Sequence, residues 1–264
     1  MTNITFATFD PELESADGFW QFGMVLPQNA LTTDVYDYLG ILRCAMTNGS
    51  SWCGVSHGAA GQMTNALLLM AWPYQQQVLT SFRYTDSYVL PGQYTGQANL
   101  TTLASRVTTG TGNESMFEIV YHCQNCLQWN QGGEMGNVST SNGGSALGRA
   151  AAKAGPSNAG CPSQISFGFH DNGYGQFTAE FQNATSTNYD MWAALPAKPV
   201  TLASGCTAAT GNSTSTSTPT ASSSSTATGT ASPSSSATSG GQKVGMKDWV
   251  AAGFTVAAAW LLVV

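Results

Sequence analysis

The sequence predicts an all-β fold, an antiparallel β-sandwich, followed by a disordered stalk rich in Ser and Thr. Short apolar segments with an alternating pattern recur between residues 18 and 181, and Gly- and Asn-rich turns separate them. No long segment with an apolar period of 3.6 residues stands out before residue 242. Residues 204–241 are almost entirely Ser, Thr, Ala, Gly and Pro, which cannot bury enough apolar surface to offset the entropy of ordering.

The expected strands follow from local pattern. Segments with the length and composition of strands are residues 18–26, 66–72, 77–84, 116–121 and 175–181. Residues 66–72 form a continuous apolar run typical of a fully buried strand, and we expect Pro73 to end it. Residues 34–42 fit either a short helix or another strand. Together these segments are enough for one sandwich.

The composition divides the 264-residue chain into three parts. Residues 1–203 are expected to form one domain, because about 200 residues suffice for a full β core. Residues 204–241 form the stalk. The remaining segment, 242–264, ends in an apolar stretch that is shorter than the ~20 residues a spanning helix needs.

The C-terminal segment predicts attachment to a membrane. Small residues at 239–241, a polar spacer and a terminal apolar tail match a GPI-attachment signal. The alternative is a tail-anchored or marginal transmembrane segment. Residues 1–6 contain neither a basic region nor an apolar region, so we expect no signal peptide in this sequence.

Charge, sequons and cysteines predict an extracellular glycoprotein with disulfides. Charged residues make up 8% of the chain and the net charge is −6, without the basic patch that nucleic acid requires. The six cysteines form an even set. The Asn-x-Ser/Thr sequons, which matter only in the secretory pathway, are Asn3, Asn48, Asn99, Asn113, Asn137, Asn183 and Asn212.

Cys123 and Cys126 form a C-x-x-C motif whose simplest interpretation is a local disulfide. Residue 127 is Leu, so the motif is not the C-x-x-C-H site that attaches haem covalently. It follows a predicted strand and lacks the helix of a thioredoxin motif, and no second C-x-x-C completes a zinc site. Proximity in the sequence pairs the other cysteines: Cys44 with Cys53, and Cys161 with Cys206.

Met63 and His170 are the candidate functional residues. We find no Gly-x-Ser-x-Gly elbow, no identifiable carboxylate pair and no Gly-x-Gly-x-x-Gly after a strand, which disfavours hydrolases and nucleotide-cofactor enzymes. Small residues and aromatics surround both Met63 and His170. A thioether and an imidazole facing each other across an apolar pocket are a ligand pair for haem iron. Taken singly, a Met beside a Leu run is usually core, and a lone His is usually packed or exposed.

Several motifs in the same order resemble the haem-binding cytochrome domain of fungal cellobiose dehydrogenase, in the iron-reductase-like group of auxiliary activities related to DOMON domains. The resemblance covers about residues 5–200. Its motifs are residues 61–69 (GQMTNALLL), 81–84 (SFRY) with Tyr88 and Pro91, 94–96 (YTG), 123–129 (CQNCLQW) and 170–175 (HDNGYG).

The resemblance implies a DOMON-like or immunoglobulin-like sandwich that holds one non-covalent haem b between its sheets. It places the axial ligands on Met63 and His170 and a cofactor-binding role on Tyr88. Six-coordinate iron suits outer-sphere electron transfer. The sequence departs from the family at His57, which could compete as a ligand or form a pH-sensitive contact, and at residues 143–156, which are unusually rich in Ala and Gly.

The leading hypothesis is therefore an extracellular, surface-tethered b-type cytochrome, an electron-transfer protein and not a stand-alone catalyst. No dehydrogenase domain follows the stalk, so we expect a separate flavin dehydrogenase or small reductant as donor. Expected acceptors are a copper polysaccharide monooxygenase, ferric iron or a quinone. The alternatives are a carbohydrate-binding module that uses Tyr88, Tyr94 and Trp129 as exposed aromatics, and a structural wall protein with a decayed haem site.

Overall fold

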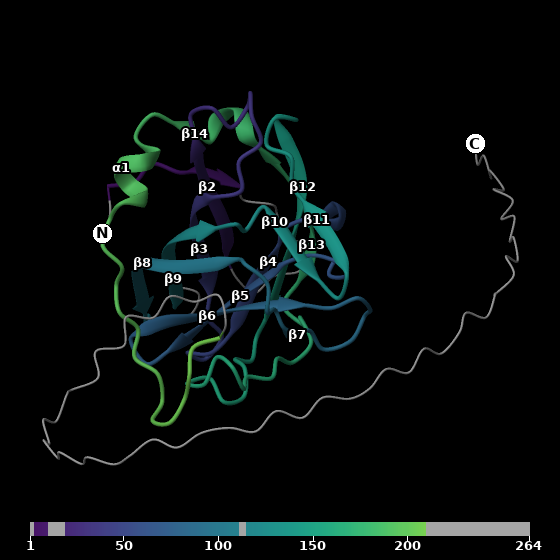
Figure 1. Cartoon of the computed structure of the whole chain (residues 1–264). Coiled ribbons are helices and arrows are strands. Elements are labelled where there is room, and N and C mark those ends of the chain that lie inside the picture. The colour runs from purple at the N-terminus through teal and green to yellow at the C-terminus, as the bar shows by residue number, and fades with distance from the viewer. Residues whose placement is uncertain (1–2, 10–18, 111–114, 210–264) are drawn as a thin grey trace, which may run out of the picture. The chain divides into compact units, whose positions relative to one another are not determined.

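The computed structural model describes residues 3–9, 19–110 and 115–209, and these form two packed β-sheets (Figure 1). The first sheet has the order β1 (Ala7–Phe9), β2 (Trp20–Pro27), β3 (Tyr38–Ala45), β9 (Met116–Gln124) and β8 (Asn99–Thr108). A short strand, β14 (Thr185–Ser186), also pairs with β2. The second sheet has the order β13 (Tyr174–Glu180), β12 (Gly144–Ala152), β4 (Trp52–Ser56), β5 (Leu68–Tyr74), β6 (Gln77–Tyr84) and β7 (Gly92–Gln93).

The predicted all-β antiparallel fold is confirmed. Within the described ranges, each strand pairing is antiparallel except that of β14 with β2. A separate hairpin consists of β10 (Gln128–Gln131) and β11 (Glu134–Asn137). The other regular elements in the described part of the chain are the 3₁₀ turns Ala59–Gly61 and Phe181–Asn183 and the short helix α1 (Tyr189–Ala193).

One strand boundary differs from the sequence prediction, and one open alternative is decided. The prediction that Pro73 ends its strand is wrong, because β5 continues to Tyr74 and Pro73 pairs with Val78. On the side of β4, the last residue of β5 that pairs is Ala71. Pro73 therefore lies beyond the residues of β5 that pair with β4. The ambiguous segment 34–42 contributes to strand β3 and not to a helix.

All three predicted disulfides are present: Cys44–Cys53, Cys123–Cys126 and Cys161–Cys206. The bond from Cys44 in β3 to Cys53 in β4 joins the two sheets, so Cys53 points into the space between them. Because side chains alternate along a strand, Trp52, Gly54 and Ser56 face the opposite, outer side of the second sheet. This alternation decides where the functional site lies.

The described part of the chain extends to residue 209. Ala209 is buried, and Cys206 is bonded to Cys161. Residues 210–241 of the expected stalk and the whole expected anchor at 242–264 lie outside the described residues. The search of the described residues finds no helix that is both long enough and apolar enough to cross a membrane.

A hydrogen-bonded network crosses the core between the sheets. The Tyr38 hydroxyl lies 2.5 Å from His57 Nε2 and 3.2 Å from the Tyr121 hydroxyl. On its other side, His57 Nδ1 lies 3.0 Å from the carbonyl oxygen of Leu67. All three polar side chains are fully buried, and each has a partner, as stable burial of polar groups requires.

His57 makes the stability of the fold depend on pH. Burial lowers the pKa of His57 from 6.5 to about 4. Between these pH values the unfolded chain binds a proton at His57 and the folded chain does not, so stability is lost as pH falls from 6.5 to about 4. We expect a loss of about 3 kcal/mol in the free energy of unfolding across this window, measured by urea denaturation at a series of pH values.

The His57→Gln variant should flatten that pH dependence. His122→Gln is the matched control, because it makes the same substitution at a histidine that is only partly buried. If the free energy of unfolding depends equally steeply on pH in His57→Gln and in the parent protein, the pH dependence does not come from His57.

Candidate cofactor site

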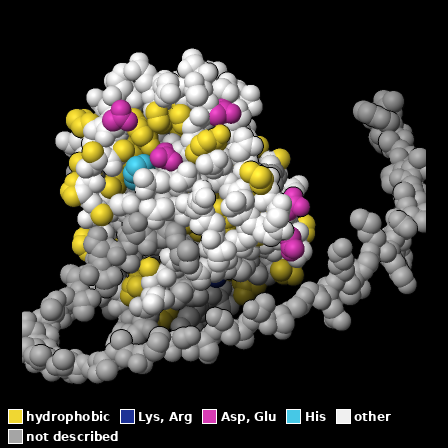
Figure 2. All heavy atoms as spheres, viewed as in Figure 1, with side chains coloured by type: hydrophobic (Ala, Val, Ile, Leu, Met, Phe, Trp, Pro, Cys, Tyr) yellow, Lys and Arg dark blue, Asp and Glu magenta, His cyan; other side chains and the backbone are white. Residues whose placement is uncertain are grey.

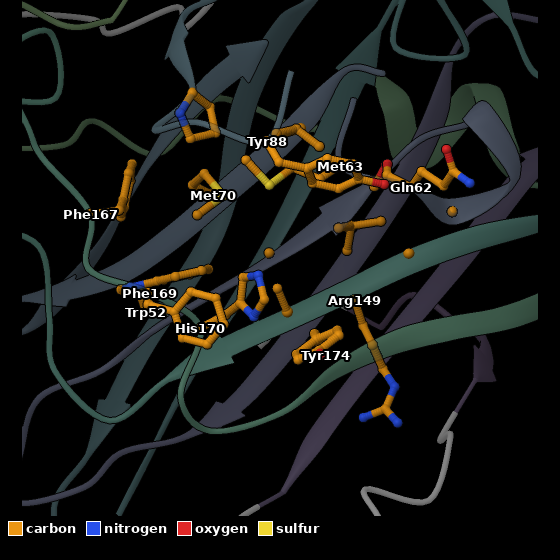
Figure 3. Close-up of a pocket in the computed structure, with 18 of the residues that line it drawn as sticks. Trp52, Gln62, Met63, Met70, Tyr88, Arg149, Phe167, Phe169, His170 and Tyr174 are labelled. Carbon is orange, nitrogen blue, oxygen red and sulfur yellow. The ribbon is translucent and has the colours of Figure 1, made fainter. Parts of the chain in front are cut away.

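A cavity of about 920 Å³ lies on the outer face of the second sheet. Its floor is made by alternating residues of β4, β5 and β12, and loops at 61–63, 88–91 and 167–170 form its walls (Figure 3). The expectation that the pocket lies between the sheets is wrong. The interior of the sandwich is filled by packed side chains and the Cys44–Cys53 bond, so the loops enclose the space outside instead.

Two positions on the cavity floor are glycines because a side chain would not fit there. A Cβ on Gly54 would lie 2.6 Å from the Leu69 carbonyl oxygen, and a Cβ on Gly148 would lie 2.2 Å from the Gly61 carbonyl oxygen. Both positions therefore exclude a side chain by contact with backbone. With Ala150 beside them, they leave a smooth surface under the cavity.

We expect Gly148→Ala to disturb the site strongly. The added methyl group would push on the backbone at Gly61 and displace the loop that carries Met63, at a cost of about 1–3 kcal/mol in the free energy of unfolding. Gly92→Ala is the matched control, because its nearest contact would be an ordinary 3.9 Å. Thermal unfolding of both variants measures the difference in stability. Equal unfolding midpoints would show that the backbone around residue 148 accommodates the added methyl group without cost.

The structure brings Met63 and His170 to the same cavity. Met63 and Tyr88 lie on one side of the opening, and His170 lies on the other with Phe169 and Tyr174 (Figure 3). The Ser56 hydroxyl donates a hydrogen bond to the Gln62 carbonyl, which ties the Met63 loop to the floor strand β4. Met70, on β5, also lines the cavity and is a second thioether in the same space.

His170 is held as a neutral imidazole. Its ring packs between those of Phe169 and Tyr174, at centroid distances of 4.2 and 4.5 Å. Burial lowers the pKa of His170, so the ring keeps a lone pair at neutral pH. Its Nδ1 is buried and makes no hydrogen bond with any described residue. A buried nitrogen without a partner costs free energy, and such groups often mark a ligand site.

Arg83 anchors the segment that leads to His170, and its role is not evident from the sequence. Its Nη2 donates a hydrogen bond of 2.9 Å to the Pro162 carbonyl, and its guanidinium carbon lies 5.5 Å from the centroid of the Phe167 ring. Phe167, a cavity residue, also packs edge-on against Trp52 and Trp72. Burial lowers the pKa of Arg83 to about 10, so the cation persists at neutral pH.

The predicted aromatic platform for carbohydrate is not present. Tyr88 is 76% exposed at the rim of the cavity, but Tyr94 and Trp129 are only 1% and 5% exposed. Tyr94 packs edge-on against Phe82, and Trp129 Nε1 donates a hydrogen bond to the Asn65 carbonyl. Both rings therefore belong to the core.

His57 does not line the cavity, and both of its ring nitrogens are engaged in the core. The structure therefore gives no support to the expectation of a competing ligand. The floor residues Gly54, Gly148 and Ala150 were not predicted as site residues. The unusual Ala and Gly content of residues 143–156, which include strand β12, was the only signal in the sequence for Gly148 and Ala150, and Gly54 had none.

The described surface carries few charges. On the face shown in Figure 2, Asp and Glu side chains are scattered and Lys and Arg hardly appear.

The chain is similar to proteins of known structure and function. Among solved structures, the chain is similar to the cytochrome domain of Myriococcum thermophilum cellobiose dehydrogenase, with 42% identity and a TM-score of 0.70 over 75% of this chain and 93% of that one. It is also similar to the cytochrome b domain of pyranose dehydrogenase from Coprinopsis cinerea, with 27% identity and a TM-score of 0.59 over 76% of this chain and 95% of that one.

A curated relative is the pyrroloquinoline quinone-dependent pyranose dehydrogenase of Coprinopsis cinerea, 31% identical over 132 residues. The matched region is 50% of this chain but 16% of that relative, so the likeness is confined to a small part of the larger protein. Residues 1–191 match the family described as the cytochrome domain of cellobiose dehydrogenase, and the chain belongs to this family.

Proposed function

We propose that this chain is a b-type cytochrome that binds one non-covalent haem b through Met63 and His170 and transfers single electrons. The observation that carries the proposal is the meeting of these two side chains, from distant motifs, at opposite sides of one cavity. The similar cytochrome domains named above support it.

The residues present fit a haem. The cavity volume lies within the about 300–1,000 Å³ typical of ligand and cofactor sites. The glycine floor leaves room for a flat group, and the neutral His170 and the thioether of Met63 are suitable donors.

The bound haem supplies reversible one-electron chemistry at iron. The chain's own contribution would be to hold the haem iron with the thioether of Met63 and the imidazole of His170, and to keep the site largely apolar. The thioether favours the reduced state of the iron. The buried cation of Arg83 behind Phe167 acts in the same direction, because reduction lowers the positive charge nearby.

The proposed partners follow from single-electron chemistry. The donor is a flavin dehydrogenase or a small reductant, and the acceptor is a copper polysaccharide monooxygenase, ferric iron or a quinone. The proposed location is extracellular, with cell-surface attachment through a GPI signal at 242–264. The disulfides and the sequons support the secretory pathway.

The described sequons differ in their suitability for glycosylation. Asn3, Asn48, Asn137 and Asn183 are exposed, whereas Asn99 is half-buried and its Nδ2 donates a hydrogen bond to Gln124. Asn113 and Asn212 lie outside the described residues.

An absorbance spectrum tests the proposal directly. The protein is expressed in a secretory host with sufficient haem, and spectra are recorded before and after dithionite. We expect the bands of a low-spin six-coordinate haem, with sharpened bands after reduction. A colourless protein would refute the cytochrome function. The burial of Tyr94 and Trp129 leaves no observation that favours the carbohydrate-binding alternative.

A further inference from the structure

The network of Tyr38, His57 and Tyr121 lies directly beneath the cavity. Ser56 and Leu68 line the cavity floor, and the next residues in the chain, His57 and Leu67, form the near end of the network. His57 reaches across to Tyr38 of β3, in the other sheet. One layer of the second sheet therefore separates the network from the cofactor site.

The hydrogen bonds of this network have a defined direction. The Leu67 carbonyl can only accept, so His57 Nδ1 carries the ring proton and Nε2 presents a lone pair. Tyr38 must then donate its hydroxyl proton to Nε2, at 2.5 Å. With its own proton committed, the Tyr38 oxygen accepts from the Tyr121 hydroxyl, at 3.2 Å.

We propose that Tyr38 is a redox-active residue, a one-electron donor beneath the cofactor cavity that uses His57 as its proton acceptor. In the forward step, one electron passes from the Tyr38 phenol to a one-electron oxidant, the O–H bond breaks, and the proton moves to His57 Nε2. The products are a neutral tyrosyl radical, an imidazolium ion and the reduced oxidant. One electron from a reductant and return of the same proton restore the pair.

Three features of the site fit this role. The proton acceptor is already hydrogen-bonded, so no rearrangement is needed when the electron leaves. The imidazole is neutral at physiological pH because burial lowers its pKa to about 4, so it is free to take the proton. All three side chains are shielded from solvent, and Tyr121 remains as a donor to the radical oxygen.

The benefit would be protection of the cavity. Thioethers are readily oxidised to sulfoxides, which are polar and would disrupt an apolar site. Met63 and Met70 both line the cavity. The one-electron oxidant in this setting would be generated from peroxide at the haem iron, which requires that one of the two proposed iron ligands is displaced, so this part of the inference rests on the proposed haem binding.

The first experiment does not depend on haem. The protein is oxidised with photogenerated tris(bipyridine)ruthenium(III), with persulfate as the sacrificial quencher, and frozen for electron paramagnetic resonance. We expect a long-lived tyrosyl signal that carries hyperfine coupling to an imidazole nitrogen, identified by ¹⁵N-histidine labelling. Because the coupling is measured in the unaltered protein, the result does not depend on any variant folding. An absent signal, or one without nitrogen coupling, overturns the proposal.

Variants with Tyr→Phe substitutions identify the tyrosine that carries the signal. Tyr38→Phe should lose it, whereas Tyr121→Phe, which removes a hydroxyl from the same core, should keep it with a shifted g-value. Tyr189→Phe is a second control, because Tyr189 also faces an imidazole, that of His122 at 3.3 Å. A signal that persists in Tyr38→Phe and disappears in Tyr189→Phe would place the radical elsewhere.

The second experiment tests protection. The haem-loaded protein is treated with hydrogen peroxide, and sulfoxide at Met63 and Met70 is measured by mass spectrometry. We expect more sulfoxide in Tyr38→Phe than in the parent protein or Tyr121→Phe. Equal sulfoxide in all three would refute the protective role. A chain that binds no haem but forms the nitrogen-coupled radical would refute the cytochrome proposal and leave the redox role of Tyr38 standing.

Discussion

We expect the His170→Ala variant to lose the low-spin six-coordinate spectrum of the haem-loaded protein completely. His170 is the histidine whose ring lies in the cavity with a buried nitrogen that has no described partner, so no other imidazole can replace it there. Absorbance of the reduced and oxidised protein measures the effect. His122→Ala is the matched control, because His122 lies on strand β9 of the other sheet.

The thioether ligand is tested in the same way. Met63→Leu should also abolish the low-spin spectrum, and Met70→Leu, a change of the same size at the second cavity thioether, should retain it. The reverse result would assign the ligand to Met70. Loss of the spectrum in His57→Ala with retention in His170→Ala would show that the histidine assignment is wrong.

Removing the Cys161–Cys206 disulfide should give the largest loss of stability. The bond closes a loop with a sequence separation of 45, for which the chain-entropy relation gives about 4 kcal/mol in the free energy of unfolding. It also fixes the start of the segment that passes Arg83 and ends at His170. Urea denaturation of the Cys161→Ser, Cys206→Ser double variant measures the loss.

The Cys123→Ser, Cys126→Ser double variant is the control for this prediction. Its bond spans a sequence separation of only 3, so its removal restricts the unfolded chain less and should cost less. Haem loading should fall only in the first double variant, because that bond holds the His170 segment. Equal losses of stability in the two variants would show that loop closure does not govern the effect.

The local pattern of apolar and polar residues predicts much of the fold. The alternation in residues 77–84 predicts strand β6 with the bounds that the structure shows, because period two is a property of a single strand. Burial along β6 is nonetheless continuous from Val78 to Tyr84, which the alternation does not predict. The disulfides followed from proximity in sequence. The strands β8 and β12 were not predicted, since their Thr-, Ala- and Gly-rich sequences lack a clear apolar alternation.

The candidate ligands Met63 and His170 could be named from the sequence, because the motifs around them resemble those of a known family. Tyr94 and Trp129 were placed at the surface and are buried. The local sequence around a single aromatic ring carries no signal of its burial. Only the packing of its segment against the rest of the fold decides whether the ring meets solvent or the core.

The sequence by itself determined the β class, the three disulfides and the two residues that meet at the cavity. Tertiary structure decided that the cavity lies outside the sandwich, that Gly54 and Gly148 form its floor, and that His57 joins a core network. The reason is physical. Periodicity and motifs belong to a short stretch of chain, whereas the face that each strand presents is set by contacts such as Cys44–Cys53 between distant segments.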